Sequence, residues 1–126
     1  MKRILIADDE PHIVTALEFL LKNNGYEVQV ARNGDEALAL MGSAPPDLVL
    51  LDVMMPLRSG YDVCRQIRRQ TELRAIKVVM LSAKGGQADV QKGLDAGADL
   101  YITKPFSNRE LLEKISAVLS EEKPAR

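Results

Sequence analysis

The stretch LVLLDVMMP, Leu48–Pro56, contains four consecutive apolar residues, then a carboxylate, and ends in a proline. An unbroken apolar run of this length is typical of a strand covered on both faces, as strands are in a parallel sheet. Similar runs occur at Ile4–Ala7 and Val78–Leu81, and shorter or more polar ones at Val28–Ala31 and Tyr101–Thr103. The sequence therefore predicts five short strands.

Stretches of helix length separate these strands. Apolar residues recur in them at helical spacing, for example Ile13 with Leu17 and Leu111 with Ile115. Alternating strands and helices are typical of a doubly wound α/β fold. We expect a flavodoxin-like, five-stranded parallel sheet in the order 2-1-3-4-5 with five helices. Residues that start or end helices support this division: Pro11, Gly25, Asn33, Ser59 and Ser107.

The bulk composition favours one ordinary globular domain. The chain has 126 residues, which suits a single domain over 1–120 followed by a polar tail or the start of a linker at 121–126. Its 17 basic and 18 acidic residues leave a net charge of −1, which argues against direct nucleic-acid binding. We expect the basic cluster Arg65–Arg69 to form a solvated helix face.

The sequence also lacks the signals of a secreted or membrane protein. Cys64 is the one cysteine, so it has no partner for an internal disulfide, and we interpret it as a small core residue. No stretch approaches the roughly 20 apolar residues that a membrane helix requires. We therefore expect a cytoplasmic protein without a membrane contact.

Polar residues follow four of the predicted strands, where an open parallel sheet binds its ligands. Asp8 and Asp9 follow the first strand, and Asp52 follows the third. Ser82 ends the fourth strand, and the fifth runs into Lys104. Each residue alone has an ordinary explanation, as a helix cap, a turn former, a loop hydroxyl or a surface lysine. Their joint occurrence at strand ends predicts one site, because a site is a geometric constellation.

The convergence of three carboxylates indicates a divalent cation. Without one, the carboxylates would repel one another and be driven towards protonation. Oxygen ligands suit Mg²⁺, which commonly binds one or two carboxylates and retains waters or phosphate oxygens. A carboxylate beside Mg²⁺ can attack a phosphoryl donor, and phosphoryl transfer requires mainly positioning and neutralisation of charge. We therefore predict that Asp52 is a phosphoacceptor, assisted by Lys104 and Ser82.

Four motifs resemble the receiver domain of bacterial response regulators and occur in the family's order. They are Asp8-Asp9, Asp52-Val-Met-Met-Pro56 followed by Gly60, Leu81-Ser-Ala83, and Tyr101-Ile-Thr-Lys-Pro-Phe106. The resemblance covers roughly residues 2–120. It implies a switch of two-component signalling, similar to chemotaxis regulators and not an enzyme, whose phosphoryl donor is a histidine kinase or phosphotransfer protein.

The resemblance also implies the metal ligands. Asp9, Asp52 and the backbone carbonyl of Met54 match the residues that bind Mg²⁺ directly in this family, and Asp8 matches an acid that acts largely through water. We expect the side chains of Met54 and Met55 to pack against the protein.

The remaining motif residues match the parts of a switch. Lys104 resembles the lysine that pairs with the phosphoryl oxygens, and we expect a cis Lys104–Pro105 bond that directs this lysine towards Asp52. Ser82 resembles the hydroxyl that closes on the phosphoryl group. Tyr101 resembles the aromatic residue that turns inward when Ser82 moves.

Output is expected at the face formed by the fourth helix, the fifth strand and the fifth helix. We predict the fourth helix within 85–97, where Gly85, Gly86 and Gly93 would let it shift at low cost. A downstream output domain or protein, or a second copy of the chain in a phosphorylation-dependent homodimer, would meet this face near Asp99.

Other functions on similar folds fit the sequence less well. A flavin-binding protein presents a phosphate-cradling loop after its first strand, where Asp8 and Asp9 would repel the phosphate. A phosphatase of the dehalogenase type uses a second aspartate two residues after its nucleophile, and that position here is Met54. The alternative is a pseudo-receiver, an interaction module not regulated by phosphorylation, although such a module would normally have lost part of its acidic pocket.

Overall fold

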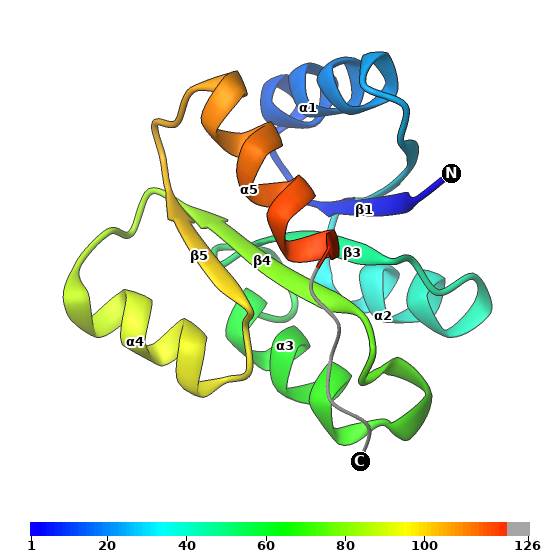
Figure 1. Cartoon of the computed structure of the whole chain (residues 1–126). Coiled ribbons are helices and arrows are strands. Elements are labelled where there is room, and N and C mark those ends of the chain that lie inside the picture. Colours follow the sequence, from blue (N-terminus) through cyan, green and yellow to red (C-terminus); the bar gives the residue numbers. More distant parts are fainter. Residues whose placement is uncertain (121–126) are drawn as a thin grey trace.

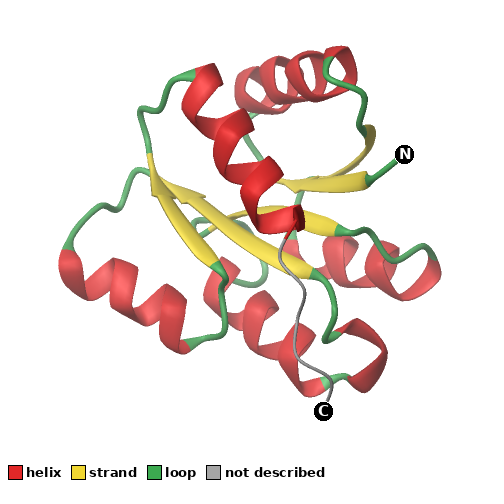
Figure 2. Ribbon diagram, in the orientation of Figure 1, coloured by secondary structure: helices red, strands yellow, loops and turns green. Residues whose placement is uncertain are grey.

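The computed structural model describes residues 1–120, and along them strands alternate with helices (Figures 1 and 2). The predicted tail at 121–126 lies outside the described residues. The strands are β1 (Arg3–Ala7), β2 (Glu27–Ala31), β3 (Leu48–Asp52), β4 (Lys77–Ser82) and β5 (Leu100–Thr103). The helices are α1 (Pro11–Asn23), α2 (Gly34–Ser43), α3 (Gly60–Arg69), α4 (Gln87–Asp95) and α5 (Asn108–Ser120), with a short 3₁₀ turn η1 (Thr71–Leu73) before β4.

The five strands form one parallel sheet in the order β2-β1-β3-β4-β5, which confirms the predicted topology. Strand β3 lies at the centre, and all five of its residues are buried. In the register, Ala7 of β1 pairs with Leu51 of β3, and Asp52 pairs with Leu81 of β4. The carboxyl ends of β1, β3 and β4 are therefore neighbours at one edge of the sheet.

Two apolar cores cover the two faces of the sheet. Helices α1 and α5 pack on one face, where Ile6 and Leu50 point, and α2 and α3 pack on the other, where Leu5 and Leu51 point (Figure 1). Cys64 is fully buried in the second core, as expected. Helix α4 lies at the margin beside β5, and the one buried residue of this helix is Gly93. None of the helices within residues 1–120 is long and apolar enough to cross a membrane.

The predicted helix boundaries have local physical causes. The side chains of Asn33, Ser59 and Ser107 each accept a backbone N–H three residues later, at 2.8, 3.2 and 3.0 Å. Pro11 is the first residue of α1, where its missing N–H costs no hydrogen bond. Gly25 has a φ of +87° just beyond the end of α1, a conformation that favours glycine.

Helix α4 is shorter than predicted, and only one of the three glycines expected within it lies in the helix. Gly85 and Gly86 precede the helix, which begins at Gln87. Within α4, a Cβ added to Gly93 would lie 2.7 Å from the ring of Tyr101 and 2.9 Å from the sulfur of Met80. Gly93 therefore allows α4 to approach Tyr101 closely. The expected position of Gly85 and Gly86 within the helix is wrong, and the low cost of shifting the helix stays a prediction.

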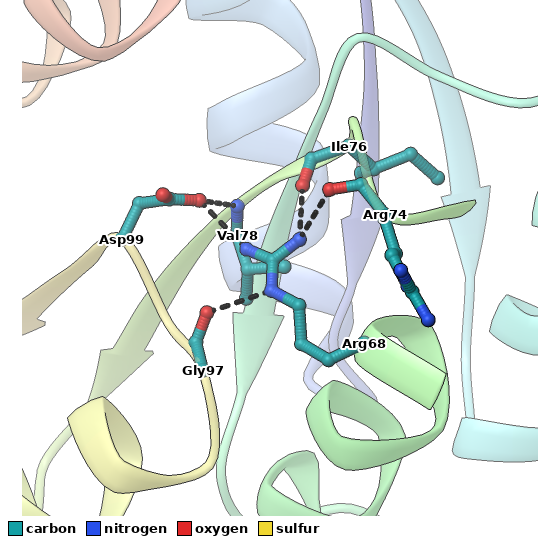
Figure 3. Close-up of polar contacts among 6 residues, drawn as sticks. All are labelled: Arg68, Arg74, Ile76, Val78, Gly97 and Asp99. Carbon is teal, nitrogen blue, oxygen red and sulfur yellow. Dashed lines mark hydrogen bonds and ion pairs between the residues drawn. The ribbon is translucent and has the colours of Figure 1, made fainter. Parts of the chain in front are cut away.

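The basic cluster on α3 is only partly a solvated face, because the side chain of Arg68 is 20% exposed and enters a polar network (Figure 3). We call this network the Arg68 clasp. The guanidinium of Arg68 donates to the carbonyls of Gly97, Arg74 and Ile76 at 2.9, 3.0 and 2.7 Å. It also donates to the Asp99 carboxylate at 2.8 Å. The same oxygen of Asp99 accepts the N–H of Val78 at 2.8 Å. We expected Asp99 to lie where a partner would bind. Its carboxylate binds the protein's own α3 and β4 instead.

Candidate functional site

Three carboxylates meet at the carboxyl edge of the sheet. Asp8 and Asp9 follow β1, and Asp52 ends β3, the strand next to β1. One oxygen from each of the three side chains lies within 4.8 Å of the other two. Asp8 and Asp52 are buried and Asp9 is exposed. The structure thus brings together the three acids that the sequence predicted would converge.

Backbone hydrogen bonds orient the two buried carboxylates. Oδ1 of Asp8 accepts the N–H of Glu10 at 2.9 Å, and Oδ1 of Asp52 accepts the N–H of Met54 at 3.3 Å. The loop after each strand therefore folds back on the acid that begins it. A Cβ on Gly60 would overlap the carbonyl oxygen of Asp52, so glycine is needed where α3 starts against this strand end.

Lys104 follows β5 and reaches the same cluster. The Lys104–Pro105 bond is cis, as predicted. The Nζ atom lies 3.4 Å from Oδ2 of Asp8, and both side chains are largely buried. The lysine was expected to point towards Asp52. Its direct contact is with Asp8, and it is close enough for its charge to lower the pKa of Asp52.

The pKa of Asp52 is raised from 3.8 to about 6. Burial is the largest cause, and the negative charge of Asp8 is the second. The positive charge of Lys104 and the N–H of Met54 act in the opposite direction, and a weaker contribution from Asp9 raises the pKa further. A site with this balance of charges favours the arrival of a cation.

Ser82 and Tyr101 are joined through the backbone of one loop residue. Ser82 is 1% exposed at the end of β4, and its Oγ accepts the N–H of Lys84 at 3.1 Å. The Tyr101 hydroxyl donates to the carbonyl of Lys84 at 2.6 Å. The two predicted switch residues thus hold opposite ends of the same peptide segment. Sequence reasoning missed the linking residue, because the link involves only its backbone.

The loop after Asp52 exposes two large apolar side chains. Met54 is 58% exposed, so the expectation that it packs is wrong, whereas Met55 packs against the core on the α3 side. Leu57 is 73% exposed and has a φ of +72°. The N–H of Arg58 donates to the carbonyl of Pro56 at 2.8 Å. This three-residue turn with a positive central φ is a strained γ-turn, which β-turn patterns in the sequence do not reveal.

The donor set fits a hard divalent cation. All three side chains at the cluster offer carboxylate oxygens, and Mg²⁺ prefers oxygen ligands to nitrogen or sulfur. Oδ1 of Asp52 accepts a backbone N–H, the two oxygens of Asp8 contact a backbone N–H and Lys104, and Asp9 is open to solvent. The cluster therefore leaves oxygens for an ion and an exposed side on which waters and a phosphoryl group have room.

Comparison with known proteins gives one consistent family. The model of the response regulator receiver domain matches residues 4–116. A response regulator receiver domain protein, CheY-like, from Methanospirillum hungatei JF-1 is 34% identical, with a TM-score of 0.88 over 94% of each chain. The receiver domain of a signal transduction histidine kinase from Syntrophus aciditrophicus is 36% identical, with a TM-score of 0.91 over 100% of this chain and 96% of that one.

A third solved structure, the chemotaxis protein CheY4 of Vibrio cholerae, is 31% identical, with a TM-score of 0.88 over 94% of this chain and 98% of that one. The match of the family model covers most of the chain, and the fold and strand order agree with it. The chain belongs to the response regulator receiver domain family.

Proposed function

We propose that this receiver domain, residues 1–120, accepts a phosphoryl group on Asp52 in a Mg²⁺-dependent reaction. The observation that supports this most strongly is the position of one oxygen each of Asp8, Asp9 and Asp52 within 4.8 Å of one another. A buried ammonium, on Lys104, lies at the same cluster. This arrangement combines a nucleophile with the charges that phosphoryl transfer requires.

The residues of the chain have separable roles in the proposed transfer. An oxygen of Asp52 forms a new O–P bond while the N–P bond of a phosphohistidine in the donor breaks, and the donor imidazole keeps the electron pair. Lys104 neutralises charge on the phosphoryl oxygens after releasing Asp8. Ser82 supplies a hydroxyl from the neighbouring strand once it releases the N–H of Lys84.

We propose Asp9, Asp52 and the carbonyl of Met54 as direct ligands of Mg²⁺, with Asp8 acting through water. When bound, the ion supplies positive charge to a site whose own carboxylates repel an incoming phosphate. The burial of Asp52 is consistent with this role, because a buried carboxylate with a raised pKa gains ionised character when a cation arrives.

We propose that the domain works in the cytoplasm as a switch and not as a turnover enzyme. Its phosphoryl donor would be a histidine kinase or phosphotransfer protein. Its output would be read at the face formed by α4, β5 and α5, by an output domain, a separate protein or a second copy of the chain. The Ser82–Lys84–Tyr101 connection supports this direction, because it leads from the site to that face.

Intact-mass analysis tests the proposed acceptor. With Mg²⁺ and acetyl phosphate, the chain should gain one phosphoryl group that base and hydroxylamine remove. Asp52→Asn should gain none, whereas Asp95→Asn, which changes an exposed acid on α4, should be labelled like the native chain. Equal labelling of Asp52→Asn contradicts the assignment. A native chain that takes up no phosphoryl group from any donor is instead a pseudo-receiver.

A further inference from the structure

Helix α4 is attached to α3 at both ends, by contacts of different strength. At its C-terminal end, the Arg68 clasp binds the segment that follows α4 through the carbonyl of Gly97 and the carboxylate of Asp99 (Figure 3). Arg68 also binds two carbonyls that precede β4, so this end is tied to both α3 and the sheet. Hydrogen bonds from a charged guanidinium are stronger than neutral ones.

At its N-terminal end, α4 is held by one tyrosine. Tyr61, in the first turn of α3, is 6% exposed, and its hydroxyl donates to the carbonyl of Asp89 at 3.2 Å. The ammonium of Lys92, one turn further along α4, lies 4.6 Å from the centroid of the Tyr61 ring. A single neutral hydrogen bond thus attaches this end, whereas the cation–π contact of Lys92 lies in the last turn of α4.

The two helices are separated along their outer edges between these attachments. An open groove of about 490 Å³ lies there, lined by Arg65 of α3 and by residues of α4 and its C-terminal cap: Ala88, Gln91, Lys92, Asp95 and Ala96. Continuous side-chain packing does not fill this space. Besides the apolar core that α3 shares with the C-terminal cap of α4, the two helices are joined by the Tyr61 contact and the Arg68 clasp, and the Tyr61 contact is the weaker of these two.

Tyr61 is also linked to the predicted switch residue. Burial and the neighbouring Tyr101 hydroxyl raise the pKa of Tyr61 to about 12, with burial the larger cause. Tyr61 therefore stays protonated near neutral pH and has one proton to donate. Tyr61 donates this proton to the carbonyl of Asp89, and the ring of Tyr101 lies beside Gly93 of the same helix, so the position of Tyr101 affects the helix that Tyr61 binds.

Two hydrogen bonds connect Tyr101 to the site. Ser82 accepts the N–H of Lys84, whose carbonyl accepts the hydroxyl of Tyr101. If Ser82 moves towards a phosphoryl group on Asp52, the N–H of Lys84 loses its bond to Ser82. The backbone of Lys84 can then shift, and this changes the bond that the Tyr101 hydroxyl makes to its carbonyl. The ring of Tyr101 packs beside Gly93, on the helix that Tyr61 binds, so its movement reaches the Tyr61 contact through α4.

We propose that Tyr61 is a latch that holds the first turn of α4 on α3 in the unphosphorylated chain, and that the Arg68 clasp is a fixed pivot at the other end. Movement of Ser82 and Tyr101 opens the latch, and α4 then swings about the pivot. This inference rests on the proposed function, because it assigns the movement to phosphorylation of Asp52.

Tyr61→Phe tests the latch, because it removes the hydroxyl and keeps the buried ring. The readout is the affinity for beryllofluoride with Mg²⁺, a phosphoryl mimic, followed by tyrosine fluorescence in a chain without tryptophan. The native chain must break the Tyr61–Asp89 bond before it reaches the activated form, and the variant need not. We expect about three- to ten-fold tighter binding by the variant. Tyr26→Phe, a change on the α1 side of the sheet, is the matched control and should bind like the native chain.

Amide hydrogen exchange of the native chain gives a second readout that needs no variant. On addition of beryllofluoride, the N–H of Val90, in the first turn of α4, should exchange faster. The N–H groups of Ala96 and Asp99, next to the clasp, should keep their rates. Equal affinities of Tyr61→Phe and native chain, or equal acceleration at both ends of α4, would overturn the latch. A native chain that does not bind beryllofluoride would overturn the proposed function itself.

Discussion

The ammonium of Lys104 lies 3.4 Å from Oδ2 of Asp8, so the buried cation at the site is paired with the neighbour of the proposed acceptor. Both charges are largely removed from water, and each would be costly to leave unpaired. A phosphoryl group on Asp52 offers the lysine a second anion in the same pocket. The resting ion pair therefore keeps the cation in place without neutralising the nucleophile directly.

Replacing Lys104 with Gln should slow phosphorylation more than it changes folding. The variant lacks the cation that would neutralise charge on the phosphoryl oxygens, and it leaves the charge of Asp8 uncompensated. We expect the initial rate of labelling by acetyl phosphate to fall on the order of 100-fold, as for loss of one charge-stabilising group. Lys22→Gln, which removes an exposed lysine of α1, is the control. A rate like that of the control would remove Lys104 from the proposed mechanism.

Asp52→Asn should change how stability depends on pH in the presence of EDTA. The pKa of Asp52 is about 6 in the folded chain and 3.8 when unperturbed, so between these values the folded state binds more protons than the unfolded state. The contribution of Asp52 to stability is then fully present below about pH 4 and is lost as the pH rises through about 6. The asparagine side chain of the variant does not ionise, so the variant should be about 1–3 kcal/mol more stable than the native chain at pH 7.

The measurement is the urea-induced unfolding of both chains between pH 4 and pH 7. The difference in free energy of unfolding should widen across this interval and level off above it. Parallel curves would show that Asp52 titrates in the folded chain as it does in the unfolded one.

Magnesium should stabilise the native chain because a ligand that binds only the folded state raises its stability. We expect a concentration-dependent increase in Tm with Mg²⁺, a smaller increase for Asp9→Asn, and an unchanged increase for Asp95→Asn. Added EDTA should return the native chain to its starting Tm and leave it folded, since the apolar cores do not involve the acidic cluster. Unfolding by EDTA would indicate a structural metal instead.

At position 57, glycine should give a more stable protein than alanine. Its φ of +72° is strained for a side chain with a Cβ, and its exposure means that little packing is lost. We expect Leu57→Gly to be about 0.5–1 kcal/mol more stable than Leu57→Ala, which loses the same side chain and keeps the strain. Denaturant unfolding of the two variants gives this difference directly. An alanine variant at least as stable as the glycine variant would show that the turn relaxes.

Two glycines in helices should respond oppositely to alanine. Gly93→Ala would place a methyl group 2.7 Å from the Tyr101 ring, so we expect a loss of about 1–3 kcal/mol. Gly42→Ala in α2 meets no heavy atom within 4 Å and should gain up to about 1 kcal/mol from helix propensity. Thermal unfolding of both variants tests this contrast. Equal effects would mean that α4 does not pack on Tyr101 as closely as the structure shows.

The fold was predictable because it follows from local patterns. Each apolar run became a strand, and each predicted cap, such as Asn33 and Ser59, bonds to the backbone of its own helix. The convergence of Asp8, Asp9 and Asp52 then follows from topology, since strands β1 and β3 are neighbours. The spacing of residues along the chain and the expected strand order were sufficient to predict the sheet and its acidic cluster.

The remaining features depend on contacts between distant segments. Nothing near Arg68 in the sequence indicates that its guanidinium binds Gly97 and Asp99, about thirty residues away. The direct contact of Lys104 with Asp8 likewise depends on distances in the folded chain, which the sequence does not contain. The strain at Leu57 is a property of the backbone and has no side-chain signature, so sequence patterns could not report it.

The proposed pivot of α4 at the Arg68 clasp has a consequence for the size of the signal. Helix α4 has 9 residues, which at about 1.5 Å per residue makes a rod of roughly 13 Å. Turning such a rod by about 10° around the Gly97 end displaces its far end by roughly 2 Å, whereas residues beside Arg68 hardly move. The amplitude of the output thus grows with distance from Arg68, and a partner that reads the first turn of α4 receives the largest displacement.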